Sequence, residues 1–196
     1  MRDRARETRQ GPASVERTSS PATPVLYVIV CGSPAARGVP EFVRRAQGSG
    51  WQVCVVPTPM GRQFVDEGEL EHLTGFPVRT HYKHPDEPDV LPTADAFVVA
   101  PATFNTVNKI ANGITDTLAV GLICEALGAG KVVVIAPAMN RALACAGPYA
   151  RSIALLKADG ARVVLTPTTT PGSGLADPSP ARFPWSRVID ELPSAM

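Results

Sequence analysis

The fold is decided by residues 96–116, which read AFVVAPATFNTVNKIANGITD. The segment opens on an apolar run, Ala96–Ala100, and such continuous runs are typical of strands covered on both faces. A loop at Pro101–Thr106 follows. Apolar residues then recur at the spacing of one helix face, at Val107, Ile110, Ala111 and Ile114. The segment therefore predicts a buried strand, a polar loop and an amphipathic helix.

The same alternation runs outward in both directions. Four further apolar runs predict strands: Val25–Cys31, Gln52–Val56, Val132–Ala136 and Arg162–Leu165. Helical patterns separate them at Val39–Gly48, from Val107 onward through Leu118, Leu122 and Ala126, and in a last helix from Tyr149 that Gly160 ends. Strands alternating with helices indicate a three-layer α/β fold with a parallel sheet. We expect one domain at residues 25–190, with an irregular loop at Thr80–Thr93.

Composition excludes several classes of protein. The 196 residues are 44% hydrophobic and 19% charged, with a net charge of +1, so we expect neither nucleic acid nor a membrane as a partner. Residues 1–24 are rich in Arg, Ser, Thr and Pro and predict a disordered tail. The four cysteines show no CxxC spacing and are expected to be buried thiols of a cytoplasmic protein. Three histidines without a suitable ligand set predict no metal site.

Four loops follow the predicted strands at the edge where parallel sheets bind ligands. They are rich in Gly, Ser, Thr, Pro and Asn, and they lie at Cys31–Arg37, Pro57–Phe64, Pro101–Thr106 and Pro137–Arg141. Hydroxyls, amides and backbone N–H groups suit a phosphate, a polyol chain or the edge of a heteroaromatic ring. Ordinary turn chemistry is the alternative explanation for any one of them. Because Gly32-Ser33-Pro34 matches neither GxGxxG nor a P-loop, a conventional dinucleotide or triphosphate site is not indicated.

Two of these loops carry family-specific motifs. The sequence PATFNT at 101–106, with NKIANGI at 108–114 and Asp116, resembles the PASANT loop and following helix of the homo-oligomeric flavin-containing cysteine decarboxylases. The sequence PAMN at 137–140 resembles the start of that family's PxMNxxMW motif, although Leu143-Ala144 replaces Met-Trp. The resemblance spans roughly residues 25–165. It implies a Rossmann-like fold, FMN as the cofactor, and trimers or multiples of trimers with flavin near a subunit interface.

The resemblance and the residue types together suggest which side chains hold FMN. Gly32 permits close approach of the backbone, Ser33 and Thr58 can donate hydrogen bonds, and Asn105 and Thr106 stand at a helix N-terminus near Thr106. Helix capping is the alternative role of Asn105 and Thr106. The full expected set is Gly32, Ser33, Thr58, Pro101, Thr103, Phe104, Asn105, Thr106 and Met139.

The family's reaction oxidises a cysteine thiol to a thioaldehyde-like species, which then loses its carboxylate with help from a histidine. That histidine stands fourteen residues before the PASANT proline, where this chain has Glu87. We expect either Glu87 or a displaced His81 or His84 to take its place, and the alternative is that Glu87 is simply an exposed loop residue. Asn105 and Asn140 complete the candidate catalytic set, and a turn is the alternative role of Asn140.

These residues lead to one function and two rivals. The motif Gly174-Leu175-Ala176-Asp177 resembles the substrate clamp of phosphopantothenoylcysteine decarboxylases, but Asp177 replaces the redox-active cysteine, which argues against coenzyme A biosynthesis. We therefore expect an FMN-dependent oxidative decarboxylase of a cysteine-containing substrate, either a small molecule or, as the leading hypothesis, a peptide C-terminus. The rivals are another FMN-dependent oxidoreductase and a non-catalytic FMN-binding subunit of a hetero-oligomer.

Overall fold

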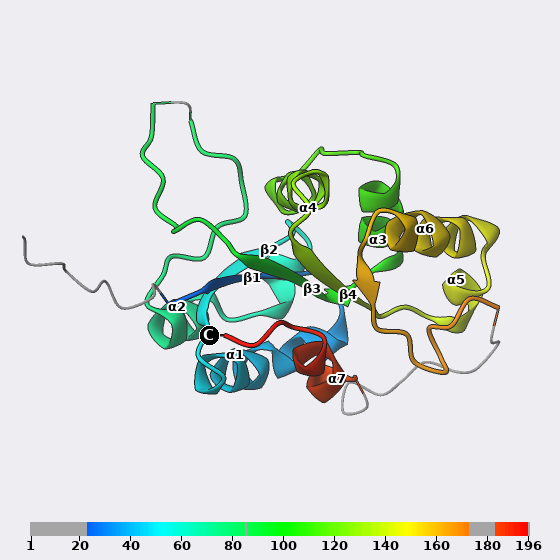
Figure 1. Ribbon diagram of the computed structural model, residues 1–196, viewed down its shortest axis with the longest axis horizontal. Coiled ribbons are helices and arrows are strands. Elements are labelled where there is room, and N and C mark those ends of the chain that lie inside the picture. The colour runs from blue at the N-terminus through cyan, green and yellow to red at the C-terminus, as the bar shows by residue number, and fades with distance from the viewer. Residues whose placement is uncertain (1–22, 85, 173–182, 196) are drawn as a thin grey trace, which may run out of the picture.

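A five-stranded parallel sheet forms the centre of the protein (Figure 1). The computed structural model describes residues 23–84, 86–172 and 183–195, so the predicted tail lies almost wholly outside the described residues. The strand order is β2-β1-β3-β4-β5. The strands are β1 (Val25–Val30), β2 (Gln52–Pro57), β3 (Ala96–Ala102), β4 (Val132–Pro137) and β5 (Arg162–Val163). The prediction of a three-layer, Rossmann-like α/β fold is confirmed.

Strands β1 to β4 are buried on both faces because alternate side chains enter two separate cores. In β1, Tyr27 and Ile29 point into one core, whereas Val28 and Val30 point into the other. The first core is covered by α3 (Phe104–Ala111), α4 (Leu118–Gly128) and α6 (Gly147–Ala158). The second is covered by α1 (Val39–Gly48), α2 (Glu67–Thr74) and α7 (Trp185–Asp190), on the opposite side of the sheet (Figure 1).

The continuous helical pattern predicted from Val107 to Ala126 is wrong. The chain forms two helices, because α3 ends at Ala111 and Gly113 then adopts a φ of +65°. Ile114, expected on the apolar face, is 50% exposed. The side chain of Thr117 starts α4 by accepting a hydrogen bond from the Val120 N–H.

The segment predicted as a loop at Pro101–Thr106 is also shorter than expected. Strand β3 continues to Ala102 and α3 begins at Phe104, so Thr103 alone separates them. Helices α2 and α7 were not predicted, nor were the short α5 (Arg141–Ala144) and the 3-10 turns η1 (Pro34–Gly38) and η2 (Gly61–Phe64). Cys145 is exposed and Cys124 half-buried, which corrects the expectation of four buried thiols.

Residues 79–93, called the arm below, form no helix or strand in their described part. The arm projects beyond the sheet as the green loop beside α4 (Figure 1). Tyr82 ties it to the body, since its hydroxyl donates to the Thr117 carbonyl at 3.2 Å. A Cβ on Gly121 would collide with that hydroxyl, so a larger residue there would displace the Tyr82 side chain from α4. Among the described helices, none is long and apolar enough to cross a membrane.

Candidate functional site

A pocket of about 540 Å³ lies beyond the carboxyl ends of the strands. We call it the carboxyl-end pocket. Three of the four predicted loops contribute to it, together with the start of α4. Its lining consists of Gly32, Thr58, Pro59, Met60, Gln63, Thr103, Asn105, Thr106, Lys109, Thr117 and Val120. The structure therefore brings together five of the predicted cofactor residues: Gly32, Thr58, Thr103, Asn105 and Thr106.

Two glycines bring backbone close to this pocket. A Cβ on Gly32 would lie 2.5 Å from the Met60 Cγ, and one on Gly61 would collide with the Val30 carbonyl at the end of β1. The Gly61 N–H donates to Thr58 Oγ1 at 3.0 Å, and the Thr58 N–H donates to the Val30 carbonyl at 2.8 Å. The loop after β2 is thereby held against the loop after β1, with Met60 covering Gly32.

The N-terminus of α3 opens into the same pocket. Thr103 precedes the helix in an extended conformation (φ −76°, ψ 159°), and no described side chain caps the helix. The first N–H groups of a helix have no partner within the helix, and they favour an anion or an electron-rich oxygen. Here they stand beside the hydroxyls of Thr103 and Thr106, which lie 3.2 Å apart.

Asn105 does not cap α3, so the capping alternative is wrong for this residue. It is the second residue of the helix, exposed, and its side chain makes no hydrogen bond to any described residue. Both its amide donor and its amide acceptor are therefore left for a ligand in the pocket that it lines.

Lys109 contributes a cation to the pocket lining, but its charge is already paired. Its Nζ donates to Asp116 Oδ2 at 2.6 Å, and the two side chains are 25% and 49% exposed. Sequence reasoning did not select Lys109 as a site residue. The signal was present in the motif at 108–116, where a lysine and an aspartate bracket the end of the helix.

Five other predicted residues lie outside this pocket. Ser33 accepts from the Ala35 N–H at 3.4 Å, Pro101 is buried in β3, and the Phe104 ring lies 6.5 Å from that of Tyr149. Met139 packs against the first core. Asn140 Oδ1 accepts from the Leu143 N–H at 3.0 Å at the start of α5, which is the turn role considered for it.

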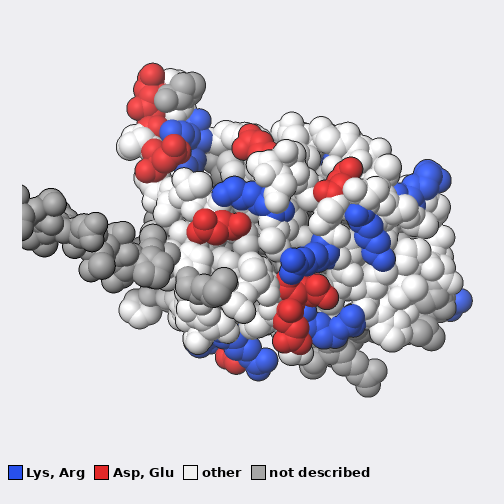
Figure 2. Space-filling model, viewed as in Figure 1, with Lys and Arg blue, Asp and Glu red and all other residues white. Residues whose placement is uncertain are grey.

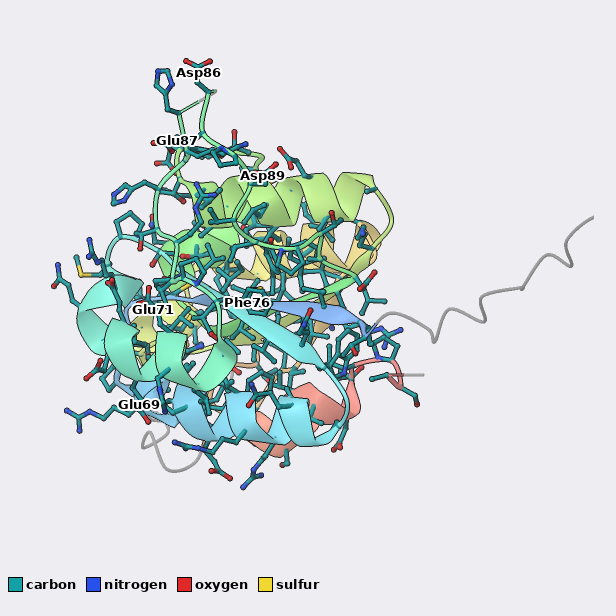
Figure 3. All side chains as sticks on the ribbon, turned by 90° about the vertical axis from the view of Figure 1, so that its left-hand side faces the viewer. Glu69, Glu71, Phe76, Asp86, Glu87 and Asp89 are labelled. Atoms are coloured by element: carbon teal, nitrogen blue, oxygen red, sulfur yellow. The ribbon has the colours of Figure 1, made fainter. Side chains whose placement is uncertain are left out.

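The two candidate acid–base residues of the arm, Glu87 and His84, contact each other rather than the pocket. The His84 N–H donates to Glu87 Oε2 at 3.0 Å, and no described arm residue lines the carboxyl-end pocket. Figure 3 shows Asp86 and Glu87 at the far end of the arm. Figure 2 shows the acidic side chains there beside basic ones, in line with the 2.9 Å contact of Lys83 Nζ and Asp89 Oδ1.

A second pocket, of about 670 Å³, lies between the arm, α4 and the amino ends of the strands. We call it the amino-end pocket. Several of its polar side chains have partners within the fold. The Tyr27 hydroxyl donates to the Pro92 carbonyl at 2.9 Å and Lys131 Nζ donates to the Ala94 carbonyl at 2.5 Å. Burial raises the pKa of Tyr27 to about 12. None of the predicted site residues lines this pocket.

Comparison with known proteins gives one consistent result. A family model described as Flavoprotein matches residues 13–191. A probable phosphopantothenoylcysteine decarboxylase from Streptococcus mutans is 32% identical over 145 residues, which cover 70% of this chain and 80% of the relative. The coenzyme A biosynthesis bifunctional protein of Escherichia coli is 30% identical over 137 residues, which cover 67% of this chain and 33% of that longer protein.

A solved structure gives a second kind of match. An FMN-dependent cysteine decarboxylase from thioviridamide biosynthesis superimposes with a TM-score of 0.64 at 30% identity, covering 73% of this chain and 90% of that one. The residues that the family model matches include the sheet and the loops that line the carboxyl-end pocket.

Proposed function

The chain belongs to the flavoprotein family, and we propose that it is an FMN-dependent decarboxylase that oxidises and decarboxylates a cysteine at the C-terminus of a peptide. One observation carries the proposal. The carboxyl-end pocket gathers hydroxyls, an unpartnered amide and a helix N-terminus in a chain whose fold is similar to that of an FMN-dependent cysteine decarboxylase.

The pocket residues fit FMN in size and chemistry. A volume of about 540 Å³ falls within the roughly 300–1,000 Å³ of small-molecule sites. Thr58, Thr103 and the α3 N–H groups can donate to phosphate and ring oxygens, while Met60 and Val120 offer apolar contact to the ring. Bound FMN would supply the two-electron oxidation of the cysteine thiol.

The residues of this chain would orient the substrate and set the environment of its carboxylate. Asn105 can orient the substrate with both halves of its amide, because the fold leaves that amide without a partner. Since Asp116 neutralises Lys109, the lining offers no unpaired cation to a carboxylate. A carboxylate that is desolvated and not ion-paired loses CO₂ more readily, so this pairing favours decarboxylation.

We propose that Glu87 or His84 acts from the arm of a second copy of the chain, in a homotrimer or a multiple of trimers. Neither residue lines the pocket of its own chain, and the arm projects away from the body. A site shared between chains would join one chain's pocket to its neighbour's arm. The family's preference for flavin at a subunit interface supports the same arrangement.

A mixing experiment tests this sharing. An Asn105→Asp chain keeps its arm, and a chain with His84→Ala and Glu87→Gln keeps its pocket; each alone should be inactive. Dissociated and reassembled at random, roughly a quarter of shared sites would combine two intact halves and regain activity. Recovery near zero would mean that each chain uses its own arm or none.

The solved neighbour, a cysteine decarboxylase of thioviridamide biosynthesis, supports a peptide substrate. A second candidate, decarboxylation of phosphopantothenoylcysteine, is favoured by the 32% identity to the Streptococcus mutans relative. Asp177, which lies outside the described residues, argues against this candidate, because the clamp of such enzymes carries cysteine at the matching position.

One assay separates the two candidates and tests the function itself. The purified chain with FMN is incubated in air with cysteine-ending peptides and, separately, with phosphopantothenoylcysteine. The expected result is a mass loss of about 46 Da, for CO₂ and two hydrogens, on the peptides alone. A loss of CO₂ alone from the pantothenoyl substrate would favour the second candidate. Absence of any change, in a chain that binds no flavin, would refute the proposed function.

A further inference from the structure

A buried thiol lies beneath the carboxyl-end pocket without lining it. Cys31 directly follows β1 and is fully buried. Its Sγ lies 3.3 Å from Thr106 Oγ1, which in turn lies 3.2 Å from Thr103 Oγ1. Thr106 and Thr103 both line the pocket, whereas Cys31 does not. Three side chains thus form a hydrogen-bonded row from the core to the pocket wall.

The chemistry of these groups gives the row a direction. Burial raises the pKa of the Cys31 thiol more than its hydrogen bonds with Thr106 and Thr103 lower it, so the thiol stays protonated and donates to Thr106. Thr106 is 4% exposed, and among the described residues its hydroxyl meets only Cys31 and Thr103. Since a buried hydroxyl hydrogen without an acceptor is costly, it points at Thr103 Oγ1.

The hydrogen of Thr103 is then the last in the row. Thr103 is half-buried and faces the pocket, and its oxygen already accepts from Thr106. A hydroxyl normally rotates between donating and accepting. Its hydrogen can then turn to the Cys31 sulfur, a weak acceptor within reach, or into the pocket, where the phosphate, carbonyl oxygens and ring nitrogens of a flavin are stronger acceptors.

We propose that Cys31 is a positioning residue, which acts through Thr106 to hold the Thr103 hydroxyl as a hydrogen-bond donor toward bound FMN. This inference rests on the proposed function, since it presumes that FMN occupies the carboxyl-end pocket. It assigns Cys31 no contact with flavin and no redox step of its own.

The chain contains a matched control for the purely structural alternative. Cys54 on β2 is also fully buried and belongs to the same core as Cys31. It lines neither pocket. Replacing either cysteine by alanine removes one buried sulfur from the same core, so the packing cost should be similar. Only Cys31 is joined to the pocket by a row of hydroxyls.

The experiment compares Cys31→Ala, Cys31→Ser and Cys54→Ala by melting temperature, FMN dissociation constant and the flavin absorption band at about 450 nm. Both alanine variants should melt at similarly lowered temperatures. Loss of one hydrogen bond should raise the FMN dissociation constant of Cys31→Ala about five- to tenfold and shift its absorption band. Cys54→Ala should bind FMN like the parent, and Cys31→Ser should restore affinity and spectrum, because a hydroxyl can donate to Thr106.

Other outcomes would contradict either the role of Cys31 or the proposed function. If Cys31→Ala and Cys54→Ala bind FMN equally well, Cys31 is structural while the proposed function stands. If Cys31→Ala does not fold, Cys31→Val, which fills the space but cannot donate, takes its place with the same expected loss. If the parent chain itself binds no FMN, the proposed function fails and takes this inference with it.

Discussion

The two ends of the sheet carry pockets of similar size that differ in the hydrogen-bonding groups they offer to a ligand. The amino-end pocket is the larger, at about 670 Å³ against about 540 Å³. Its Tyr27 and Lys131 donate to carbonyls of the fold, and its Lys83 is paired with Asp89. At the carboxyl end, the Asn105 amide and the first N–H groups of α3 have no described partner. An uncapped helix N-terminus and an amide without a described partner, rather than volume, therefore distinguish the carboxyl-end pocket from the amino-end pocket.

The largest expected effect tests the unpartnered amide at the carboxyl end. Asn105→Asp removes the amide donor and adds a negative charge beside the cofactor and substrate. We expect turnover to fall at least about a hundredfold, in line with the roughly 2.7–4 kcal/mol attributed to a lost transition-state donor. The melting temperature should stay within a few degrees, because an acidic side chain in the first turn of α3 is favourable there.

Asn112→Asp is the control for this substitution. Asn112 is exposed at the other end of α3 and lies outside the pocket. It should retain parental turnover. Equal turnover of Asn105→Asp and the parent would remove the amide from the mechanism and weaken the contrast between the two ends.

A smaller effect is expected from narrowing the same pocket. The Cβ of Gly32→Ala would lie 2.5 Å from the Met60 Cγ, so the flexible Met60 side chain would be pushed aside, toward the space that the cofactor needs. We expect FMN affinity to fall about tenfold, close to 1.4 kcal/mol, with little change in melting temperature. Isothermal titration of the apoprotein with FMN measures the change.

Gly128→Ala provides the comparison, because a Cβ at Gly128 would meet no atom within 4 Å. This variant should bind FMN as the parent does. If Gly32→Ala binds FMN normally, the cofactor does not approach the loop after β1, and the proposed location of the site is wrong.

The sequence predicted the strands of the sheet more accurately than the helices around them. Strands β1 to β4 were predicted within two residues at each end, because runs buried on both faces are continuously apolar. The break between α3 and α4 was missed, since apolar spacing continued across it to Ile114. Its signals were Gly113, which adopts positive φ, and Thr117, which caps α4. Helix α2 was missed because Leu70 is its only fully buried residue.

The candidate site divides in the same way. The motif at 101–106 led to Thr103, Asn105 and Thr106, because residues adjacent in sequence around one helix N-terminus stay adjacent in space. Counting back from Pro101 identified Glu87, but sequence distance says nothing about the course of an irregular arm, which carries Glu87 away from the pocket. Lys109 lies one helical turn after Asn105 and could have been found from the motif, whereas Met60 reaches the lining because its loop packs against the loop after β1, which only the fold shows.

The smallest effect is expected at the amino end, where Tyr27→Phe removes the hydroxyl that donates to the Pro92 carbonyl. We expect a loss of about 1 kcal/mol in unfolding free energy at pH 7 and unchanged FMN affinity.

The pH dependence of the unfolding free energy gives a second test of the Tyr27 hydroxyl. Burial raises the pKa of Tyr27 from 10.0 to about 12, so the folded chain keeps this proton where the unfolded chain has lost it. The stabilisation is therefore fully present below pH 10 and is lost as the pH rises toward about 12. Denaturant melts at pH 9, 10 and 11 should show stability falling less steeply in Tyr27→Phe than in the parent. Reduced FMN affinity in this variant would show that the amino-end pocket influences FMN binding, which would contradict the conclusion that only the carboxyl end of the sheet binds the cofactor.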